Sequence, residues 1–400
     1  MVQLNNTFRH ANRDDPSTRS KANPAARSKQ TTAISLPSGS TSLLSPSTTS
    51  LLSLISRLTS HLRRSNQFTP TLQHVKSLLY NKEYLAAFGT ESEEGEEWRE
   101  VYFARWTPAR AVLYERAFKE LGVGEMLGWV EDEGEKEERE VREARRKREG
   151  KEVEEKVTGM GDKVEDREVL MIGSGAGAEL LALGSLLGSS KRVEGKSVPR
   201  IKVKAIDQGS WGSLVNKMDQ GMKEEWSALN DDKFQLEFLQ GDLLSDYSAT
   251  PPTSSTPSFP PLNLNLGSPN LKLVTILFTI TELLLQSRPS TLRFLSTLTS
   301  SAPKGLHLLI IESASLALIP IGTGGRTYPL GTLLDHALTG AAGGSGEDGK
   351  WEIVKSEEAK WFRMPEGAEE VYNKDVEESG KGIKVKLENS RVVLRLYRKL

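Results

Sequence analysis

The sequence predicts an α/β fold whose mostly parallel sheet carries helices on both faces. Between residues 168 and 313, five short apolar runs alternate with helical stretches, and this alternation is typical of a parallel sheet. The runs are almost continuously apolar, as expected of strands buried on both faces. The last segment, 385–400, alternates apolar and polar residues instead, which indicates an antiparallel strand added at the end.

The expected elements follow one another in a regular order, since stretches with helical periodicity separate most of the runs. Strands are predicted at EVLMIGSG (168–175), IKVKAIDQ (201–208), FQLEFLQGD (234–242), LKLVTILFT (271–279), GLHLLIIES (305–313), WEIVKSEEAKWF (351–362) and VKLENSRVVLRLYRKL (385–400). Helices are predicted at AELLALGSLLG (178–188), 209–230 and ITELLLQSRPSTLRFLSTLTSSA (280–302). A sheet of this kind that ends in an antiparallel pair is the topology of class I S-adenosylmethionine-dependent methyltransferases.

Residues 65–130 are predicted to form a small helical module in front of the sheet. Apolar residues recur at helical spacing between Ala111 and Leu121. Thr107 and Pro108 resemble a helix start, with a capping residue followed by proline in the first turn. The aromatic side chains of this module are interpreted mainly as core: Tyr102, Phe103, Trp106 and Tyr114.

Segments of biased composition divide the chain. Residues 1–64 are rich in Ser and Thr and more basic than acidic, so we expect a disordered tail that buries little apolar surface. This composition also fits a nuclear-import or RNA-binding arm, or a mitochondrial transit peptide. Residues 131–165 are predicted to be a charged helical linker. The sheet domain, 166–400, has expected flexible insertions at 249–270 and 340–350.

The overall composition excludes several classes of protein. The chain has 400 residues, with 53 Lys and Arg against 54 Asp and Glu, and no cysteine. Without cysteine there is no disulfide framework, no thiolate metal site and no Cys nucleophile, and we expect no bound metal. No stretch reaches ~18 consecutive apolar residues, so no membrane helix is expected. The neutral total excludes a protein that is basic throughout, so nucleic-acid binding must be local.

The strongest local signal is a glycine loop in MIGSGAGAEL (171–180), where a strand ends and a helix begins. Gly173, Ser174, Gly175 and Gly177 permit a tight turn and a close approach of the backbone to a ligand at the helix N-terminus. The loop satisfies GxGxG, as in methyltransferases. It also satisfies the dinucleotide pattern GxGxxA, so on its own it leaves the two cofactors open.

The ends of the next two strands favour the sulfonium cofactor. Asp207 ends the second strand, where both cofactor classes place an acid for ribose hydroxyls. Asp242 follows the third strand, where methyltransferases often place an acid for the adenine amino group. There is one glycine loop, and no His or Lys motif for hydride transfer is visible. The candidate cofactor-binding residues are Gly173, Ser174, Gly175, Gly177, Asp207, Gln208, Asp242, Leu243 and Thr279.

Several longer segments resemble one family, the fungal 25S ribosomal RNA uridine-N3 methyltransferases. They are YFARWTPARAVLYERAF (102–118), FTITELLLQSRPSTLRFLSTLT (278–299), IIESASLALIPIGTGGRTYPLGTLLDHAL (310–338), AKWFRMPEG (359–367) and KLENSRVVLRLYRK (386–399). The resemblance covers roughly residues 67–400. It implies a class I fold, S-adenosylmethionine as methyl donor, and large-subunit ribosomal RNA or a pre-ribosome as partner.

The missing cysteine bears on the kind of methylation. Carbon-5 methylation of pyrimidines usually uses a Cys adduct, whereas methylation of a ring nitrogen needs none. Uridine N3 must lose a proton, and a positioned carboxylate can accept it. Glu282, after the fourth strand, is the first candidate base, with a helix-start acid as its alternative. Glu312, after the fifth strand, is the second candidate, with a ribose or helix-cap role as its alternative.

Basic and aromatic residues late in the chain are candidate RNA contacts. Arg326 and Tyr328 lie in the Gly-rich segment 322–331, and Trp361 and Arg363 lie in a short basic and aromatic run. We expect a monomeric enzyme of the nucleus, nucleolus or cytoplasm that is neither secreted nor bound to a membrane. Two other functions stay open at this point, a non-catalytic methyltransferase-like assembly factor and an NAD(P)-dependent oxidoreductase.

Overall fold

The computed structural model describes residues 44–89, 91–130, 165–190, 198–230, 232–248, 259, 261–321, 326–340 and 351–400. Most of the predicted tail, nearly all of the charged linker and much of both insertions lie outside these described residues. The helices are α1 (Pro46–Arg63), α2 (Phe68–Tyr80), α3 (Tyr84–Phe88), α4 (Glu93–Glu120), α5 (Val123–Met126), α7 (Ala178–Ser189), α8 (Gly212–Glu225), the 3-10 turn η1 (Ser227–Leu229), α9 (Leu243–Asp246), α10 (Ile280–Ser301), α11 (Leu330–Thr339) and α12 (Ala368–Ser379). The strands are β1 (Asp166–Ile172), β2 (Arg200–Asp207), β3 (Phe234–Gln240), β4 (Leu271–Leu277), β5 (His307–Ser313), β6 (Leu318–Ile321), β7 (Arg326–Pro329), β8 (Trp351–Phe362) and β9 (Ser390–Lys399).

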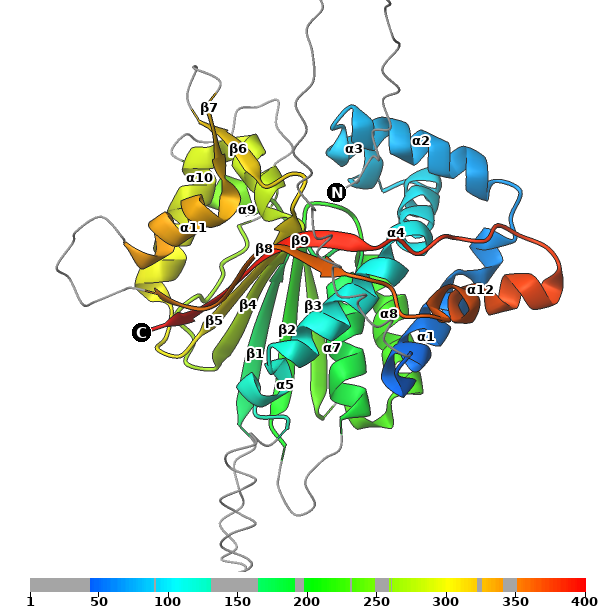
Figure 1. The fold of residues 1–400 in the computed structure, drawn as a ribbon, viewed down its shortest axis with the longest axis horizontal. Coiled ribbons are helices and arrows are strands. Elements are labelled where there is room, and N and C mark those ends of the chain that lie inside the picture. Colours follow the sequence, from blue (N-terminus) through cyan, green and yellow to red (C-terminus); the bar gives the residue numbers. More distant parts are fainter. Residues whose placement is uncertain are drawn as a thin grey trace, which may run out of the picture.

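The central sheet has seven strands in the order β3-β2-β1-β4-β5-β9-β8 (Figure 1). Strands β1 to β5 pair in parallel. Strand β9 runs antiparallel to both β5 and β8, so β8 points the same way as β5. The predicted fold class is confirmed, including the antiparallel strand at the end of the chain. All carboxyl ends of the parallel strands meet at one edge, where such sheets bind ligands.

Helices cover both faces of the sheet (Figure 1). One core joins residues of α1, α2, α4, α7 and α8 to one face of the sheet, and a second core joins α10 and α11 to the other. Since the N-terminal helices belong to the first core, they do not form a separate module. The predicted N-terminal unit and the sheet domain share one apolar interior.

Helix α1 corrects the predicted extent of the tail, because residues 46–63 are helical rather than disordered. Ser45 caps this helix and Pro46 occupies its first turn, a favourable start for a helix. Three of its leucines and its isoleucine are fully buried against the rest of the fold: Leu51, Leu52, Leu54 and Ile55. The abundant Ser and Thr residues concealed this apolar face, because composition alone does not register periodicity.

Helix α4 corrects the predicted start at Thr107 and Pro108. The helix begins at Glu93, where the Ser92 hydroxyl accepts a hydrogen bond from the Gly95 amide at 3.1 Å, and it runs through Pro108. Proline removes the hydrogen bond to the carbonyl four residues earlier, which is that of Ala104. The Tyr372 hydroxyl of α12 donates to this carbonyl at 2.7 Å. A donor from the end of the chain therefore replaces the one that Pro108 lacks.

The insertion predicted at 249–270 is packed against the fold in its last part. Leu266 is buried in the core that faces α10, and Leu262 lies against Gly241. Residues 261–270 are thus an ordered connection between β3 and β4 and not a detached loop. In the same way, Arg326 to Pro329 form strand β7 of a hairpin with β6, where the sequence indicated a Gly-rich loop.

Candidate active site

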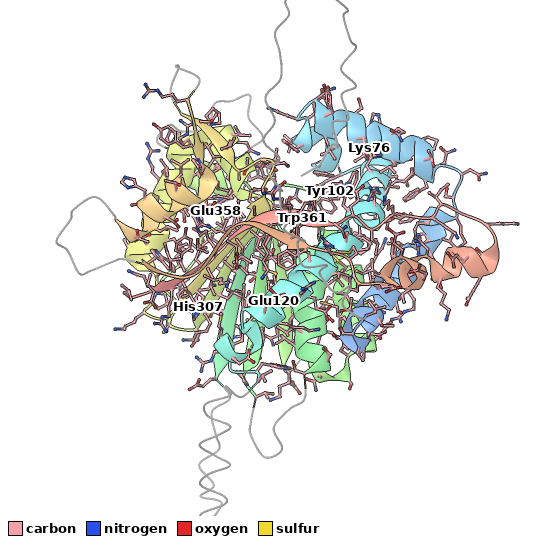
Figure 2. All side chains as sticks on the ribbon, in the orientation of Figure 1. Lys76, Tyr102, Glu120, His307, Glu358 and Trp361 are labelled. Atoms are coloured by element: carbon pink, nitrogen blue, oxygen red, sulfur yellow. The ribbon has the colours of Figure 1, made fainter. Side chains whose placement is uncertain are left out.

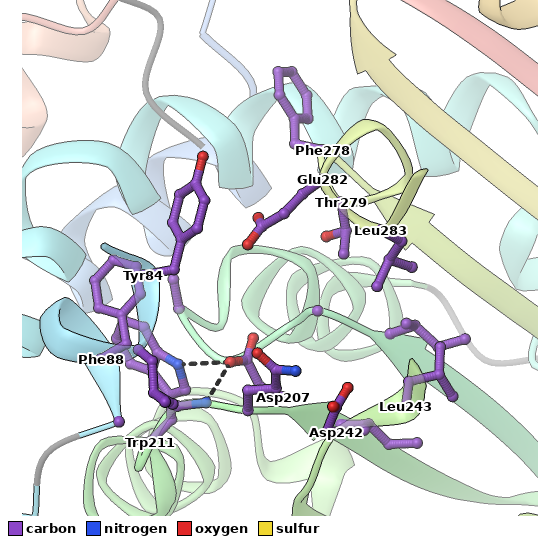
Figure 3. Close-up of a pocket in the computed structure, with 18 of the residues that line it drawn as sticks. Tyr84, Phe88, Asp207, Trp211, Asp242, Leu243, Phe278, Thr279, Glu282 and Leu283 are labelled. Atoms are coloured by element: carbon purple, nitrogen blue, oxygen red, sulfur yellow. Dashed lines mark hydrogen bonds between the residues drawn. The ribbon is translucent and has the colours of Figure 1, made fainter. Parts of the chain in front are cut away.

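A cavity opens at the carboxyl edge of the sheet, between the strand ends and the N-terminal helices (Figure 3). Its sheet wall consists of residues that follow consecutive strands: Gly173 after β1, Asp207 at the end of β2, Asp242 after β3 and Thr279 after β4. Its helical wall consists of Tyr84, Phe88, Tyr102 and Arg110 from α3 and α4. Glu282, in the first turn of α10, also lines the cavity.

The glycine loop keeps its shape through contacts with both sides of the cavity. Gly173 adopts a φ of +73°, in the left-handed region that favours glycine, and a Cβ atom there would lie 2.3 Å from the Thr279 hydroxyl. A Cβ atom at Gly175 would lie 2.0 Å from the Trp211 ring. Ser174 is buried, and Gly177 caps α7 in the left-handed conformation. These residues shape the loop, while Gly173 and Ala176 line the cavity.

Asp207 is held at the centre of the sheet wall by three N–H donors. Its Oδ2 accepts from the Gly175 amide at 3.0 Å, and its Oδ1 accepts from the Gly209 amide at 2.8 Å and from Trp211 Nε1 at 3.1 Å. Burial raises the pKa of the Asp207 carboxyl, and the three donors oppose this rise. A carboxylate offers about four acceptor sites, so Asp207 can also accept from ligand hydroxyls.

The other predicted cofactor residues also lie at this wall. Asp242 Oδ1 accepts from the Leu244 amide at 2.9 Å and so caps α9, while the residue and its neighbour Leu243 line the cavity. Gln208 lines it as well, and its carbonyl accepts from Gln240 Nε2 at 3.3 Å. The structure therefore brings together predicted residues from four separate strand ends.

Backbone strain occurs at the end of β4. Phe278 has a φ of +55°, in the left-handed region, which costs a non-glycine residue roughly 1–2 kcal/mol. Its amide donates to the Ile311 carbonyl of β5 at 2.7 Å, which holds this conformation. The ring lies 5.4 Å from the Arg110 guanidinium and 6.1 Å from the Tyr114 ring. Strain of this kind is concentrated at functional sites.

The two candidate bases occupy different environments. The Glu282 carboxylate points into the cavity toward Tyr84 and Asp207 (Figure 3). Burial raises the pKa of Glu282, and the negative charge of Asp207 raises it further. Glu312 lies outside the cavity lining and is fully buried, where it accepts from the Thr281 amide at 3.1 Å and the Ser313 amide at 2.8 Å. Glu312 therefore caps α10, the alternative role that its sequence position allowed.

The sequence patterns did not predict a functional role for the helical wall. Tyr102 is nearly inaccessible, as expected of a core residue, yet it lines the cavity beside Phe88, with ring centroids 4.9 Å apart. The Phe88 carbonyl accepts from the Ser210 amide at 2.8 Å and from Arg99 Nη1 at 3.1 Å, which fixes α3 on the loop after β2. Burial and the charge of Glu282 raise the pKa of Tyr84 to about 12, so its hydroxyl stays protonated. The one available sequence signal was the density of aromatic residues in 84–106.

The candidate RNA contacts lie on the surface. Trp361 is 57% exposed near the end of β8, and Arg363 is exposed just beyond it. Since β8 runs parallel to β5, this end lies at the same sheet edge as the cavity, opposite His307 at the start of β5 (Figure 2). Arg326 and Tyr328 are exposed on β7. On the C-terminal strand, Arg395 is buried between Asp335 and Glu358 and is not available to RNA, whereas Arg391 and Arg398 are exposed.

The cavity suits S-adenosylmethionine in its chemistry, with acids at the β2 and β3 ends, a close-packed glycine loop and apolar side chains beside them. A family model for SAM-dependent methyltransferases matches residues 55–398. The chain belongs to this family. Its cofactor is S-adenosylmethionine, which decides between the two cofactors that the glycine loop left open. This family match excludes the alternative interpretation as an NAD(P)-dependent oxidoreductase.

Individual proteins with similar sequence or fold are also known. The 25S rRNA (uridine(2843)-N(3))-methyltransferase of Saccharomyces cerevisiae is 28% identical over 345 residues, which cover 82% of this methyltransferase and 77% of the yeast protein. The N-methyltransferase NodS of Bradyrhizobium japonicum, solved with S-adenosyl-L-homocysteine, matches with a TM-score of 0.30 and 14% identity over 58% of this chain and 78% of NodS. An O-methyltransferase family 2 protein of Planctomyces limnophilus, solved with apigenin, matches with a TM-score of 0.29 and 16% identity over 60% and 52% of the two chains.

No described helix combines the length and apolar character needed to cross a membrane. Within the part of the chain that the structure describes, no group of three or more His, Asp or Glu side chains could hold a metal ion.

Proposed function

We propose that this methyltransferase transfers a methyl group to N3 of a uridine in large-subunit ribosomal RNA. The observation that carries the proposal is the sequence match to the yeast uridine-N3 enzyme, which spans most of both chains. The absence of cysteine supports it, because carbon-5 methylation through a Cys adduct is excluded. The carboxylate of Glu282 in the cavity supports nitrogen methylation, which releases a proton.

The sheet wall would hold the cofactor. Asp207 would accept from the ribose hydroxyls, Asp242 from the adenine amino group, and the glycine loop and Thr279 would line the space between them. Bound S-adenosylmethionine supplies an electrophilic methyl group on a sulfonium. The chain's own contribution is to align the uridine nitrogen with this group and to exclude water from the cavity.

Glu282 would accept the proton of uridine N3. The proton of the N3–H bond would go to the carboxylate, and the nitrogen would take the methyl group that bound S-adenosylmethionine supplies. The electron pair of the sulfur–methyl bond would stay on sulfur, which would leave as a neutral thioether. Because burial and the charge of Asp207 raise the pKa of Glu282, the carboxylate is a stronger base than an exposed glutamate. The protonated Tyr84 hydroxyl, which lies near Glu282, can donate a hydrogen bond to a carbonyl oxygen of the uracil ring.

The exposed residues at the same sheet edge would bind the RNA. Trp361 and Tyr328 can stack on unpaired bases, and Arg326 and Arg363 can contact phosphates. We propose that the substrate is the ribosomal RNA or a pre-ribosome, bound by a monomer in the nucleolus, nucleus or cytoplasm.

Nucleoside mass spectrometry of large-subunit RNA tests the proposal directly. The gene would be deleted in the organism of origin and replaced with either the wild-type or the Asp207→Ala form. We expect the deletion to abolish one 3-methyluridine and the wild-type gene alone to restore it. An unchanged 3-methyluridine content would contradict the proposal. If ribosome assembly nevertheless failed, and Asp207→Ala repaired it, the protein would be a non-catalytic assembly factor.

A further inference from the structure

The charges that line the cavity are unequal in number. Three acids line it, Asp207, Asp242 and Glu282. Among the described residues of the lining, Arg110 alone carries a positive charge. The α-carboxylate is the one anionic group of the cofactor, so Arg110 is the one charged partner of opposite sign that the described lining offers it.

Arg110 lies on the side of the cavity where the amino-acid end of the cofactor would lie. If the acid of β3 holds adenine and the acid of β2 holds the ribose, the remaining end would extend across β1 toward β4. Thr107, one turn before Arg110 on α4, donates to the Ala176 carbonyl of the glycine loop at 2.8 Å. On its other side, the Arg110 guanidinium lies 5.4 Å from the ring of Phe278, directly after β4.

Contacts with Tyr102 orient the guanidinium within this space. Arg110 Nη1 donates to the Tyr102 hydroxyl at 2.8 Å, and its planar head lies 5.8 Å from the centre of the same ring. A guanidinium has five N–H donors in a rigid fork that matches the two oxygens of a carboxylate. Both Tyr102 and Arg110 belong to α4, so the fork is fixed by one rigid helix.

We propose that Arg110 binds the α-carboxylate of S-adenosylmethionine. Helix α4 thereby joins the cofactor site from more than 60 residues before the glycine loop. The competing possibility is that Arg110 contacts the uracil base of the substrate. The inference rests on the cofactor part of the proposed function and is independent of its RNA part.

A ligand–variant cycle tests this pairing by calorimetry. S-adenosylhomocysteine and its decarboxylated analogue, which lacks only the α-carboxylate, would be titrated into the wild-type protein and into Arg110→Met. We expect wild type to prefer the complete ligand by roughly 10- to 100-fold, since a hydrogen bond to a charged group contributes about 1.5–3 kcal/mol. In Arg110→Met this preference should fall to about twofold or less. Arg116→Met, on the exposed face of α4, should keep it.

Every other result overturns the pairing. It is wrong if wild type binds both ligands equally, or if Arg110→Met keeps the preference. If Arg110→Met keeps the ligand preference and instead raises KM for RNA, Arg110 contacts the uracil base of the substrate. Should Arg110→Met fail to fold, Arg110→Lys replaces it, and its preference must fall several-fold, because a point charge does not reproduce the fork. The calorimetry measures ligand binding and uses no RNA, so it can be interpreted even if the protein does not methylate ribosomal RNA. Failure of the proposed function is therefore a separate outcome.

Discussion

The two walls of the cavity are built in different ways. The sheet wall uses short local segments, in which Asp207 and Asp242 are fixed by backbone amides within a few residues or on the neighbouring strand end. The helical wall uses rings and an arginine on α4, and its supports come from far away in the sequence, including Tyr372. The acids of the sheet wall are therefore positioned mainly by the strand order, whereas the opposite wall also depends on a contact with a segment far along the chain.

Glu282 stands between the walls, and its loss should have the largest effect. We expect Glu282→Gln to lower the single-turnover rate of RNA methylation about 100- to 10,000-fold while cofactor affinity changes little. In wild type the rate should rise with pH as Glu282 loses its proton, and burial moves this rise above the usual glutamate range. The variant should lose the rise. Glu125→Gln, at an exposed position, is the control, and an unaltered pH profile in Glu282→Gln would reject the role.

Breaking the sheet wall should chiefly affect the cofactor. Asp207→Ala removes the proposed acceptor for the ribose hydroxyls and takes away the acceptor of three N–H donors, so we expect affinity for S-adenosylhomocysteine to fall roughly 100-fold. Calorimetry measures this, with the exposed Asp232→Ala as the matched control. Equal affinities for the two variants would remove Asp207 from the site.

A buried acid behind the glycine loop gives the sheet wall a pH dependence. Glu179 accepts from the Thr275 hydroxyl, and burial raises its pKa from 4.5 to about 8. A raised pKa favours the protonated folded state, so its stabilisation is complete below pH 4.5 and is lost as pH rises toward 8. Glu179→Gln mimics the neutral form and should become more stable than wild type across this window, by up to a few kcal/mol at its upper end. Urea titrations at several pH values measure the difference, and parallel curves for the two proteins would contradict it.

Loosening the helical wall should give the smallest change. Tyr372→Phe removes the donor to Ala104, and we expect it to lower the free energy of unfolding by about 1–2 kcal/mol. Pro108→Ala returns a backbone N–H to that carbonyl. Tyr372→Phe should therefore lower the free energy of unfolding by less in the Pro108→Ala background than in wild type. Equal decreases in the two backgrounds would show that the Tyr372 hydroxyl does not replace the missing backbone donor. Tyr80→Phe, at a residue that is 71% exposed, controls for loss of a hydroxyl.

Short sequence patterns predicted the elements whose position depends on neighbouring residues in the chain. The apolar runs identified the strands, and the glycine loop and strand-end acids lie together because parallel strands end at one edge. The same pattern could not separate Glu282 from Glu312, because both follow strands and only packing decides which faces the cavity. Nor could it show that Pro108 lies inside α4 or that Arg110 lines the cavity, since both depend on contacts with distant segments.

The hydrogen bond from the Tyr372 hydroxyl to the Ala104 carbonyl affects the order in which the chain can fold during synthesis. Helix α12 also reaches α1, where the Tyr372 hydroxyl lies 3.0 Å from the Thr59 hydroxyl across 313 residues of sequence. Helices α1 and α4 are thus synthesised long before their partner α12 exists. Contacts of such long range slow folding. The helical wall is synthesised before the sheet wall, yet it should be the last part of the cavity to become rigid, and α1 and α4 expose apolar surface until then.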